Sequence, residues 1–425
     1  MTEPDPQSDP ATQRTASYEA DPAEVHRVLL LYSGGLDTSV MLKWIQERYR
    51  AEVVTLTVNL GQPGEDFAVV EGKARDLGAV DAHVIDAREE FAREYVVPAI
   101  RANAIYGLGY PLFTALGRPL IAKLAVQYAR QTGCDTIAHG CTGKGNDQVR
   151  IEATVATLAP ELKVIAPVRS WRMGREEEVR YARENGIPVK GGTEVVPYSI
   201  DDNLWGRSSE GRWIEELDHA PENDVFQLVT RPEEAPDESE VVAVSFEAGV
   251  PVALDGERVG LVELIERAGT IGARHGVGIV DNIEDRIVGL KVRDIYEVPA
   301  ATILLLAHAE LEKLVGTIHQ NQLKPMLDQR WSYLVYAGLW WDPLREDLDA
   351  YMKAANERVT GTIGIKLYKG SARVVTRESP NAVYDQQLAG FSESGGLFSQ
   401  SASPGFIELW SLQSRMAWRV RHGDD

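Results

Sequence analysis

The chain has 425 residues, of which 44% are hydrophobic and 25% are charged, and its formal net charge is −20. This length allows two or more domains with a large buried core, and the composition is that of a globular protein. The excess of acidic residues argues against a nucleic-acid-binding surface, and no apolar run approaches the ~18 residues that cross a membrane.

The first residues of the chain contain Pro, Ser, Thr, Asp and Glu with almost no apolar side chains. Such a segment buries too little surface to offset the entropy of ordering it, so residues 1–24 are expected to be disordered. The start of the chain also lacks the basic and apolar stretches of a secretory signal. Cys134 and Cys141 are too few for a disulfide framework. We therefore expect a cytoplasmic protein with reduced thiols, and neither cysteine is assigned a role.

Residues 25–197 alternate between strand-like and helix-like patterns. Strands are predicted at Arg27–Tyr32, Glu52–Asn59, Ala82–Asp86, Thr136–His139 and Lys163–Ala166, and helices at Ser39–Tyr49, Phe67–Leu77, Ala87–Asn103, Leu116–Gln131, Asp147–Leu158 and Arg175–Glu184. The strands are short and apolar on both faces, which is typical of a parallel sheet covered by helices on each side. This pattern predicts a doubly wound α/β domain that binds a nucleotide beyond the carboxyl ends of its strands.

The first predicted strand runs directly into Ser33-Gly34-Gly35-Leu36-Asp37-Thr38-Ser39, and a helix follows. Unpaired N–H groups and the dipole at a helix start attract phosphate, and two glycines let a polyphosphate approach the backbone. The hydroxyl groups of Ser33, Thr38 and Ser39 add donors, and Asp37 is placed to help hold a phosphate-bound metal ion. Neither a Walker A nor a Rossmann pattern occurs here, so the sequence predicts a third kind of phosphate loop. An ordinary strand–turn–helix joint is the alternative.

A second glycine-rich loop, from Gly140 to Arg150, follows the fourth predicted strand. In a parallel sheet it would emerge at the same edge as the first loop. Lys144 can neutralise charge that develops on phosphate. The predicted catalytic residues are Lys144, Asp37 from the first loop and Asp147 from the end of the second. Arginine binds a carboxylate through two hydrogen bonds and aspartate binds an ammonium group, so the end of this loop suits an amino-acid ligand. For this loop taken alone, a surface turn with solvated charges is the alternative.

Residues 198–380 have the mixed pattern of an α+β domain. Its predicted elements are a hairpin of Val241–Phe246 and Val252–Leu254, a helix Leu261–Arg274, a long helical region from about Ala301 to Gln320, more helix around Leu334–Tyr351, and a hairpin of Gly361–Leu367 and Ala372–Arg377. The tail, residues 381–425, has a Gly/Ser-rich break and then an amphipathic pattern that contains Phe406, Trp410 and Trp418. Exposed aromatic helices at a terminus usually dock, and we expect a subunit contact.

The two loops together resemble a known family. Ser33–Ser39 resembles the pyrophosphate-binding loop of ATP pyrophosphatases of the adenine-nucleotide α-hydrolase type, and the run from His139 to Arg150 narrows the likeness to the argininosuccinate synthase family. The likeness continues through Asn59–Gln62, Val164–Pro167, His275–Gly278, Gly289–Lys291 and Ile295–Ala300, and so covers nearly the whole chain beyond the N-terminal tail. It implies an adenine-nucleotide α-hydrolase-like domain followed by a synthetase domain.

The resemblance also implies an activity and its site. It implies a ligase that joins L-citrulline to L-aspartate through an adenylated citrulline, with ATP and Mg²⁺ as substrate, no organic prosthetic group, and a homotetramer. The implied ATP residues are Leu31, Tyr32, Ser33, Gly34, Gly35, Leu36, Asp37, Thr38, Ser39, Val58 and Gly140, the aspartate residues Thr142, Asn146 and Asp147, and the citrulline residues Tyr110, Asn146, Arg150, Ser199, Ser208, Glu284 and Tyr296. Ala115 stands where the family often has a serine that contacts citrulline, and this alanine cannot make a side-chain hydrogen bond.

Two other functions remain to be compared with the ligase. Another ATP pyrophosphatase, such as a tRNA thiolation enzyme or an amidotransferase synthetase, is disfavoured by the acidic charge, the absent Cys-x-x-Cys and the missing N-terminal nucleophilic cysteine. An ATP-binding sensor is disfavoured because it has no need of an amino-acid site. His139 and His275 are open to two interpretations, proton transfer and a structural role.

Overall fold

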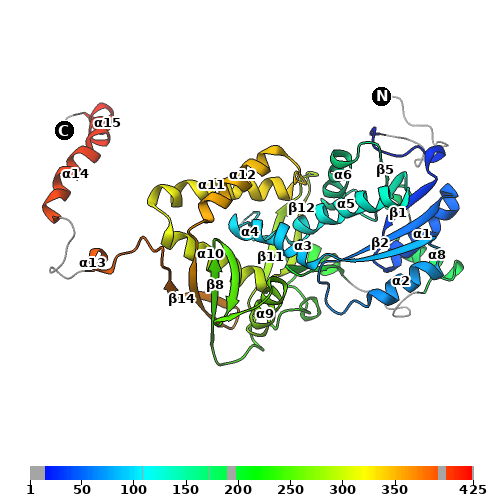
Figure 1. Cartoon of the computed structure of the whole chain (residues 1–425), viewed down its shortest axis with the longest axis horizontal. Helices are drawn as coiled ribbons and strands as arrows, with labels where there is room; N and C mark the ends of the chain where they lie inside the picture. The colour runs from blue at the N-terminus through cyan, green and yellow to red at the C-terminus, as the bar shows by residue number, and fades with distance from the viewer. Residues whose placement is uncertain (1–14, 108, 172, 189–197, 391–398, 424–425) are drawn as a thin grey trace.

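The computed structural model of the chain describes residues 15–107, 109–171, 173–188, 198–390 and 399–423. A parallel sheet organises the N-terminal part, and two antiparallel sheets with long helices organise the C-terminal part (Figure 1). The parallel sheet has the order β3-β2-β1-β4-β5. Its strands are β1 (Arg27–Leu31), β2 (Glu52–Asn59), β3 (Asp81–Asp86), β4 (Thr136–Ala138) and β5 (Lys163–Ile165).

Helices cover both faces of this sheet. They are α1 (Leu36–Tyr49), α2 (Phe67–Asp76), α3 (Arg88–Phe91), a π-helical turn (Ala92–Val96), α4 (Val97–Arg101), α5 (Phe113–Thr132), α6 (Asp147–Leu158), α7 (Pro167–Ser170) and α8 (Arg175–Glu184). Successive side chains of β1 point to opposite faces, so Leu29 joins the core with α5 and α6 while Val28 and Leu30 join the core with α1 and α2. The predicted doubly wound sheet is confirmed, and its strands begin and end within one residue of the predictions.

The order of the strands places the two loops side by side. The chain builds β1, β2 and β3 outward in one direction and then returns to place β4 and β5 on the other side of β1. The loops that follow β1 and β4 therefore leave neighbouring parallel strands at the point where the order reverses. This point is where open α/β sheets bind their ligands.

Two antiparallel sheets follow in residues 198–380. One has the order β11-β12-β7-β6, with β6 (Ser199–Asn203), β7 (Gly206–Glu210), β11 (Ile279–Asp285) and β12 (Lys291–Glu297). The other has the order β10-β9-β8-β13-β14, with β8 (Glu240–Glu247), β9 (Val250–Leu254), β10 (Glu257–Arg258), β13 (Gly361–Tyr368) and β14 (Ser371–Glu378). The helices are α9 (Leu261–Arg274), α10 (Pro299–Val315), α11 (Ile318–Tyr336) and α12 (Pro343–Asn356). The predicted α+β character and both predicted hairpins are confirmed.

The helical region predicted from about Ala301 to Gln320 is helical in the structure, but the chain divides it between two helices. α10 ends at Val315, and Thr317 begins α11 with a capping box in which its side chain accepts a hydrogen bond from the backbone N–H of Gln320. A Cβ at Gly316 would lie 2.4 Å from Asn321 Oδ1, so a larger residue at the break would displace the Asn321 side chain. The further helix predicted around Leu334–Tyr351 is also present but divided, since α11 ends at Tyr336 and Asp342 and Pro343 start a separate helix, α12.

The prediction of disorder is wrong for the part of the N-terminal segment that the structure describes. Ala20 N donates to Val164 O at 3.1 Å, and Val164 N donates to Tyr18 O at 2.9 Å, so this segment pairs with the edge strand β5. Tyr18 packs against the core beneath it. Residues 1–14 lie outside the described residues, as do the predicted domain boundary at residue 197 and most of the predicted Gly/Ser-rich break.

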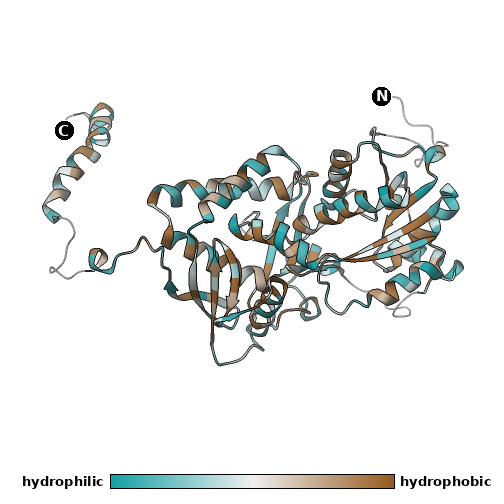
Figure 2. Ribbon diagram, in the orientation of Figure 1, coloured by the Kyte–Doolittle hydropathy of each residue, from teal (hydrophilic) through white to brown (hydrophobic). Residues whose placement is uncertain are grey.

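The tail contains α13 (Gln386–Ala389), α14 (Ser403–Trp410) and α15 (Leu412–His422). The last two helices extend away from the rest of the molecule (Figure 1), and hydrophobic residues recur along both of them (Figure 2). Trp410 is 77% exposed and Trp418 is 64% exposed. In the described residues no helix combines the length and the apolar character needed to cross a membrane.

Candidate active site

A cavity of about 1230 Å³ lies where the two loops of the parallel sheet face the four-stranded sheet of the second domain. Nine of the residues predicted for the site line it, namely Ser33, Gly35, Leu36, Asp37, Thr38, Gly140, Thr142, Lys144 and Ser199. The cavity therefore has one wall from the phosphate loop, one from the loop after β4 and one from a sheet that the sequence did not predict.

The first loop presents unused backbone donors to this cavity. Gly35 precedes α1, and no side chain caps the helix there, so the N–H groups of its first turn keep their capacity for a ligand. Gly34 has a φ of +75°, and its carbonyl accepts a hydrogen bond from Lys73 Nζ at 2.8 Å. A Cβ at Gly34 would lie 3.0 Å from Val70 Cγ2. The glycine therefore lets the loop turn closely over α2.

Four of the predicted ATP residues support the loop from behind. Tyr32 Oη and Ser39 Oγ are hydrogen-bonded to each other at 3.0 Å, and both side chains are buried. Burial raises the pKa of Tyr32, so its hydroxyl stays neutral. Leu31 is the last residue of β1, and Val58 is buried in β2. These four side chains are not among those that line the cavity.

An ionic cluster joins the second loop to α5. Asp147 accepts from Arg118 Nε with Oδ2 and from Arg150 Nη1 with Oδ1, both at 2.8 Å. Arg118 also pairs with Asp201. Burial acts to raise the pKa of Asp147, but the guanidinium groups of Arg118 and Arg150 outweigh it and lower that pKa to about 2. Asp147 is therefore ionised at neutral pH, in contact with two cations.

Arg150 is the most constrained cation of the site. It is 3% exposed, its Nε donates to Tyr336 O at 3.1 Å, and its Nη1 reaches Asp147 and Thr114. Within the described residues its Nη2 has no hydrogen-bond partner. A buried guanidinium nitrogen without an acceptor is costly, so this donor suits a carboxylate that arrives with a ligand.

The four-stranded sheet carries the remaining predicted residues on one face. Tyr296 in β12 lies opposite Ser208 in β7, and Ser208 lies opposite Asp201 in β6. Alternation along the strands adds Ser199, Glu284 and Asp294 to this face. The opposite face carries Ile200 and Ile295, which pack in a small apolar cluster with Tyr198, Ile214 and Val225. Thus all four citrulline residues predicted in the second domain share one polar face.

Aromatic rings and one carboxylate close this end of the site. Tyr296 Oη donates to Glu284 Oε2 and Tyr336 Oη donates to Glu284 Oε1, both at 2.6 Å. The ring of Tyr110 stacks on that of Tyr296 with the centroids 4.7 Å apart. Asn146 Nδ2 donates to Tyr336 Oη at 2.7 Å. The structure therefore brings Tyr110, Asn146, Glu284 and Tyr296 into one buried cluster.

The departure at Ala115 does not disturb this cluster. Ala115 is fully buried in the core, and its backbone N–H donates to Tyr110 Oη at 3.3 Å. The neighbouring Thr114 supplies a hydroxyl that bonds to Tyr110 Oη and accepts from Arg150 Nη1 at 3.4 Å. A hydroxyl group is therefore present one residue before the alanine.

Both histidines have structural surroundings. His139 is 1% exposed, its Nε2 lies 3.0 Å from Glu152 Oε1, and its Nδ1 accepts from Cys141 N at 3.2 Å. His275 is buried beside Glu240, with Nε2 to Oε2 at 2.7 Å. Neither lines the cavity, so we assign neither a part in proton transfer.

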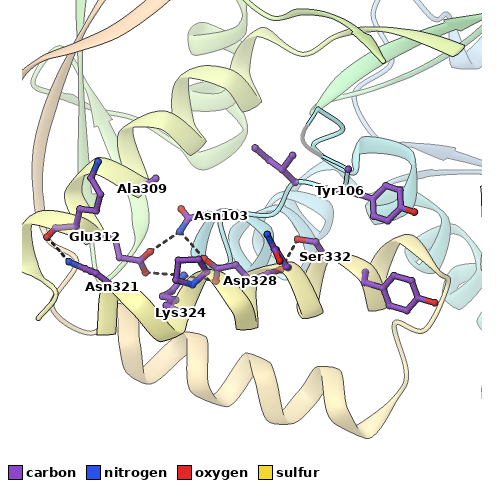
Figure 3. A pocket seen from close by; sticks show the side chains of 14 residues that line it. Asn103, Tyr106, Ala309, Glu312, Asn321, Lys324, Asp328 and Ser332 are labelled. Carbon is purple, nitrogen blue, oxygen red and sulfur yellow. Dashed lines mark hydrogen bonds and ion pairs between the residues drawn. The ribbon is translucent and has the colours of Figure 1, made fainter. Parts of the chain in front are cut away.

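A second cavity, of about 770 Å³, lies between α10, α11 and the segment before α5 (Figure 3). Its polar groups satisfy one another: Asn103 Nδ2 donates to Glu312 Oε2 at 2.7 Å, and Lys324 Nζ donates to Asp328 Oδ1 at 2.7 Å (Figure 3). Burial raises the pKa of Asp328 to about 7. This cavity holds none of the residues predicted for the site.

Sequence reasoning missed several residues that build the first cavity. Arg118, Asp201 and Arg286 line it, Lys73 fixes the carbonyl of Gly34, and Tyr336 binds Asn146 and Glu284. Arg118 lies three residues beyond Ala115, where the family often has a serine that contacts citrulline, so its position in the predicted helix was a usable signal. The other four lie outside the motifs on which the family resemblance rests.

A glycine-rich loop and a helix start at the switch point of a parallel sheet, facing a buried cluster of charged and aromatic side chains, are typical of a nucleotide-dependent enzyme with a second, small-molecule substrate. The model of the arginosuccinate synthase N-terminal HUP domain matches residues 27–188, and that of the arginosuccinate synthase C-terminal domain matches residues 198–417. The chain belongs to the argininosuccinate synthase family. It is accordingly a ligase, and the family resemblance seen in the sequence is confirmed.

Curated relatives match the sequence of this chain over nearly its full length. The argininosuccinate synthase of Rubrobacter xylanophilus is 54% identical over 389 residues, which cover 92% of this chain and 94% of that protein. That of Pyrococcus furiosus is 48% identical over 397 residues, covering 93% and 95%. A solved structure, the U34-tRNA thiolase NcsA from Methanococcus maripaludis with its 4Fe-4S cluster, matches 43% of this chain and 63% of its own at 18% identity with a TM-score of 0.28, which is too low to carry an argument.

Proposed function

We propose that the cavity between the two loops and the four-stranded sheet is where ATP, L-citrulline and L-aspartate react. As in the family, the ureido oxygen of citrulline attacks the α-phosphorus of ATP and pyrophosphate leaves. The amine of aspartate then attacks the ureido carbon of the citrullyl-adenylate, the carbon–oxygen bond breaks, and AMP leaves with that oxygen. Both nucleophiles belong to substrates, so the protein has to orient them and stabilise charge.

The first loop is proposed to hold the phosphates of ATP. The uncapped N–H groups of α1 and the hydroxyls of Ser33 and Thr38 supply donors, and Gly140 leaves room on the opposite side. Lys144 is proposed to balance charge on the α-phosphorus. The described residues contain no group of three acidic, His or Cys side chains able to hold a metal, so Mg²⁺ is proposed to enter with ATP, beside Asp37. No organic prosthetic group is proposed.

The second loop and the polar sheet face are proposed to hold the two amino acids. The unpartnered Nη2 of Arg150 suits the α-carboxylate of citrulline. Tyr110, Asn146, Ser199, Ser208, Glu284 and Tyr296 complete the proposed citrulline site. Thr142, Asn146 and Asp147 are proposed for aspartate. Asp147 retains lone pairs for an ammonium group although each of its oxygens already accepts from an arginine.

One observation carries this proposal: the phosphate loop, the loop after β4 and the polar sheet line a single cavity. The test is an assay of the purified protein with ATP, Mg²⁺, citrulline and aspartate that follows AMP, pyrophosphate and argininosuccinate. We expect equal amounts of all three products, and none when citrulline is left out. Pyrophosphate release that ignores citrulline would instead indicate another ATP pyrophosphatase.

We further propose a homotetramer in the cytoplasm. The exposed aromatic side chains of α14 and α15 have the character of a subunit contact, because monomers rarely leave so many apolar groups in water. Cys134 and Cys141 are both free thiols, as expected in a reducing compartment.

A further inference from the structure

Tyr336 is the last residue of α11 and reaches from the second domain into the amino-acid end of the site. It is fully buried and does not line the cavity. Its hydroxyl accepts from Asn146 Nδ2 at 2.7 Å and donates to Glu284 Oε1 at 2.6 Å. One oxygen atom therefore connects the loop after β4 with strand β11, and each of these carries a residue proposed to bind substrate.

The hydrogen bonds around this hydroxyl fix the direction of both partners. Asn146 Oδ1 accepts from Ile287 N at 3.1 Å, so its amide has to turn Nδ2 toward Tyr336. The hydroxyl has a single proton, and that proton faces Glu284 Oε1 and the carbonyl of Asp285, the latter at 3.1 Å. Asn146 and Glu284 are both 5% exposed, so water is poorly placed to replace a lost partner.

The ring of Tyr336 is also held. Tyr106, which lies at the end of the second cavity (Figure 3), stacks on it with the centroids 3.5 Å apart and an interplanar angle of 8°. The guanidinium carbon of Arg150 lies 5.1 Å from the centre of the ring. The hydroxyl is therefore carried on a rigid support, as is needed for a group that orients others.

We propose that Tyr336 is a positioning residue for substrate binding. It holds Glu284 and Asn146 in the geometry that citrulline requires and, through Asn146, the geometry that aspartate requires, while ATP binding on the first loop does not depend on it. This inference rests on the proposed assignment of Asn146 and Glu284 to the amino-acid substrates.

The test is Tyr336→Phe, which keeps the ring, the stack and the backbone carbonyl that accepts from Arg150. We expect the KM for citrulline to rise about 10-fold or more, as for loss of a hydrogen bond to a charged group, with a smaller rise for aspartate. The KM for ATP should stay at the wild-type value. A residue needed only for folding would instead lower the active fraction without changing any KM.

Tyr106→Phe is the matched control. Its hydroxyl donates to the same carbonyl of Asp285 at 3.0 Å but, within the described residues, forms no hydrogen bond to Asn146 or Glu284. Since Tyr106→Phe also keeps the ring that stacks on Tyr336, the citrulline KM of this variant should be unchanged. The inference is overturned if the two variants behave alike, if Tyr336→Phe raises the KM of all three substrates equally, or if it fails to fold. A wild-type protein that forms no argininosuccinate would refute the proposed function instead.

Discussion

At the scale of single residues, the site depends on buried charges that hold one another. Asp147 contacts Arg118 and Arg150, and Arg150 continues to the backbone of Tyr336. Such a cluster is rigid, but removal of one member leaves the others without compensation. A substitution in this cluster is therefore expected to change both the stability of the protein and its substrate specificity.

Asp147→Asn tests this coupling. With Arg150 left without its carboxylate partner and Arg118 paired with Asp201 alone, we expect the free energy of unfolding to fall by about 3 kcal/mol. We also expect the KM for aspartate to rise much more than the KM for ATP. Chemical denaturation and steady-state kinetics measure the two effects. Glu89→Gln, which removes one side of an exposed ion pair with Arg93, should change neither. Equal rises in the two KM values would show that Asp147 is misassigned.

Asp294 makes the stability of the protein depend on pH. It is 4% exposed, and burial together with the charge of Glu210 raises its pKa to about 7. The unfolded carboxyl has a pKa of about 4, so between about pH 4 and 7 the folded state keeps a proton that the unfolded state has lost. The free energy of unfolding should therefore decrease as the pH rises through this window, by up to about 1.4 kcal/mol per pH unit from this group.

Asp294→Asn should remove that part of the slope. Urea unfolding at several pH values between about 4 and 8 measures it. Asp218→Asn, at an exposed carboxylate, is the control and should keep the wild-type slope. Identical slopes for the wild type and Asp294→Asn would contradict the raised pKa.

At the scale of elements, the first loop works because α2 lies directly beneath it. Gly34→Ala would place a methyl group against Val70 in a left-handed backbone conformation. We expect it to lower the stability by about 1–3 kcal/mol and to weaken ATP binding, since the loop has to move. Gly64→Ala is matched to it: its φ is +73° and no atom lies within 4 Å of the new Cβ. Calorimetric titration with ATP should separate the two, and equal loss of affinity would contradict this account of the loop.

The parallel sheet could be predicted from the sequence because its strands are apolar and two of them, β1 and β4, run into glycine-rich loops. The four-stranded sheet could not. The inner face of its strands carries Asp201, Ser208, Glu284 and Asp294 in place of apolar side chains, so the usual alternation is absent. The same polar face supplies four of the seven residues predicted for citrulline. Ser199, Ser208, Glu284 and Tyr296 were found through the family resemblance, and Tyr336 was missed because a buried tyrosine at a helix end has no distinct pattern.

At the scale of the whole molecule, two features depend on more than one part of the chain. The site needs both domains, since Arg286 in the second domain reaches the backbone of the second loop at Lys144 O. In the described part of the tail, residues 381–390 and 399–423, no side chain belongs to either domain's core, and the large apolar side chains face solvent.

Removal of residues 391–425 tests the role of the tail. We expect the full chain to have the mass of a tetramer in solution and the shortened chain a smaller one, as measured by light scattering. Trp410→Glu should shift the mass in the same direction, because a charge is costly in an apolar contact. A shortened chain with the same mass as the full chain would place the subunit contacts elsewhere.

The most direct test of the central claim follows one oxygen atom. Citrulline with a heavy isotope in its ureido oxygen is incubated with ATP, Mg²⁺, aspartate and the enzyme, and the products are analysed by mass spectrometry. If the two loops hold ATP for attack at the α-phosphorus, the heavy oxygen appears in AMP, and the pyrophosphate carries none. Heavy oxygen in pyrophosphate or in inorganic phosphate would contradict the account.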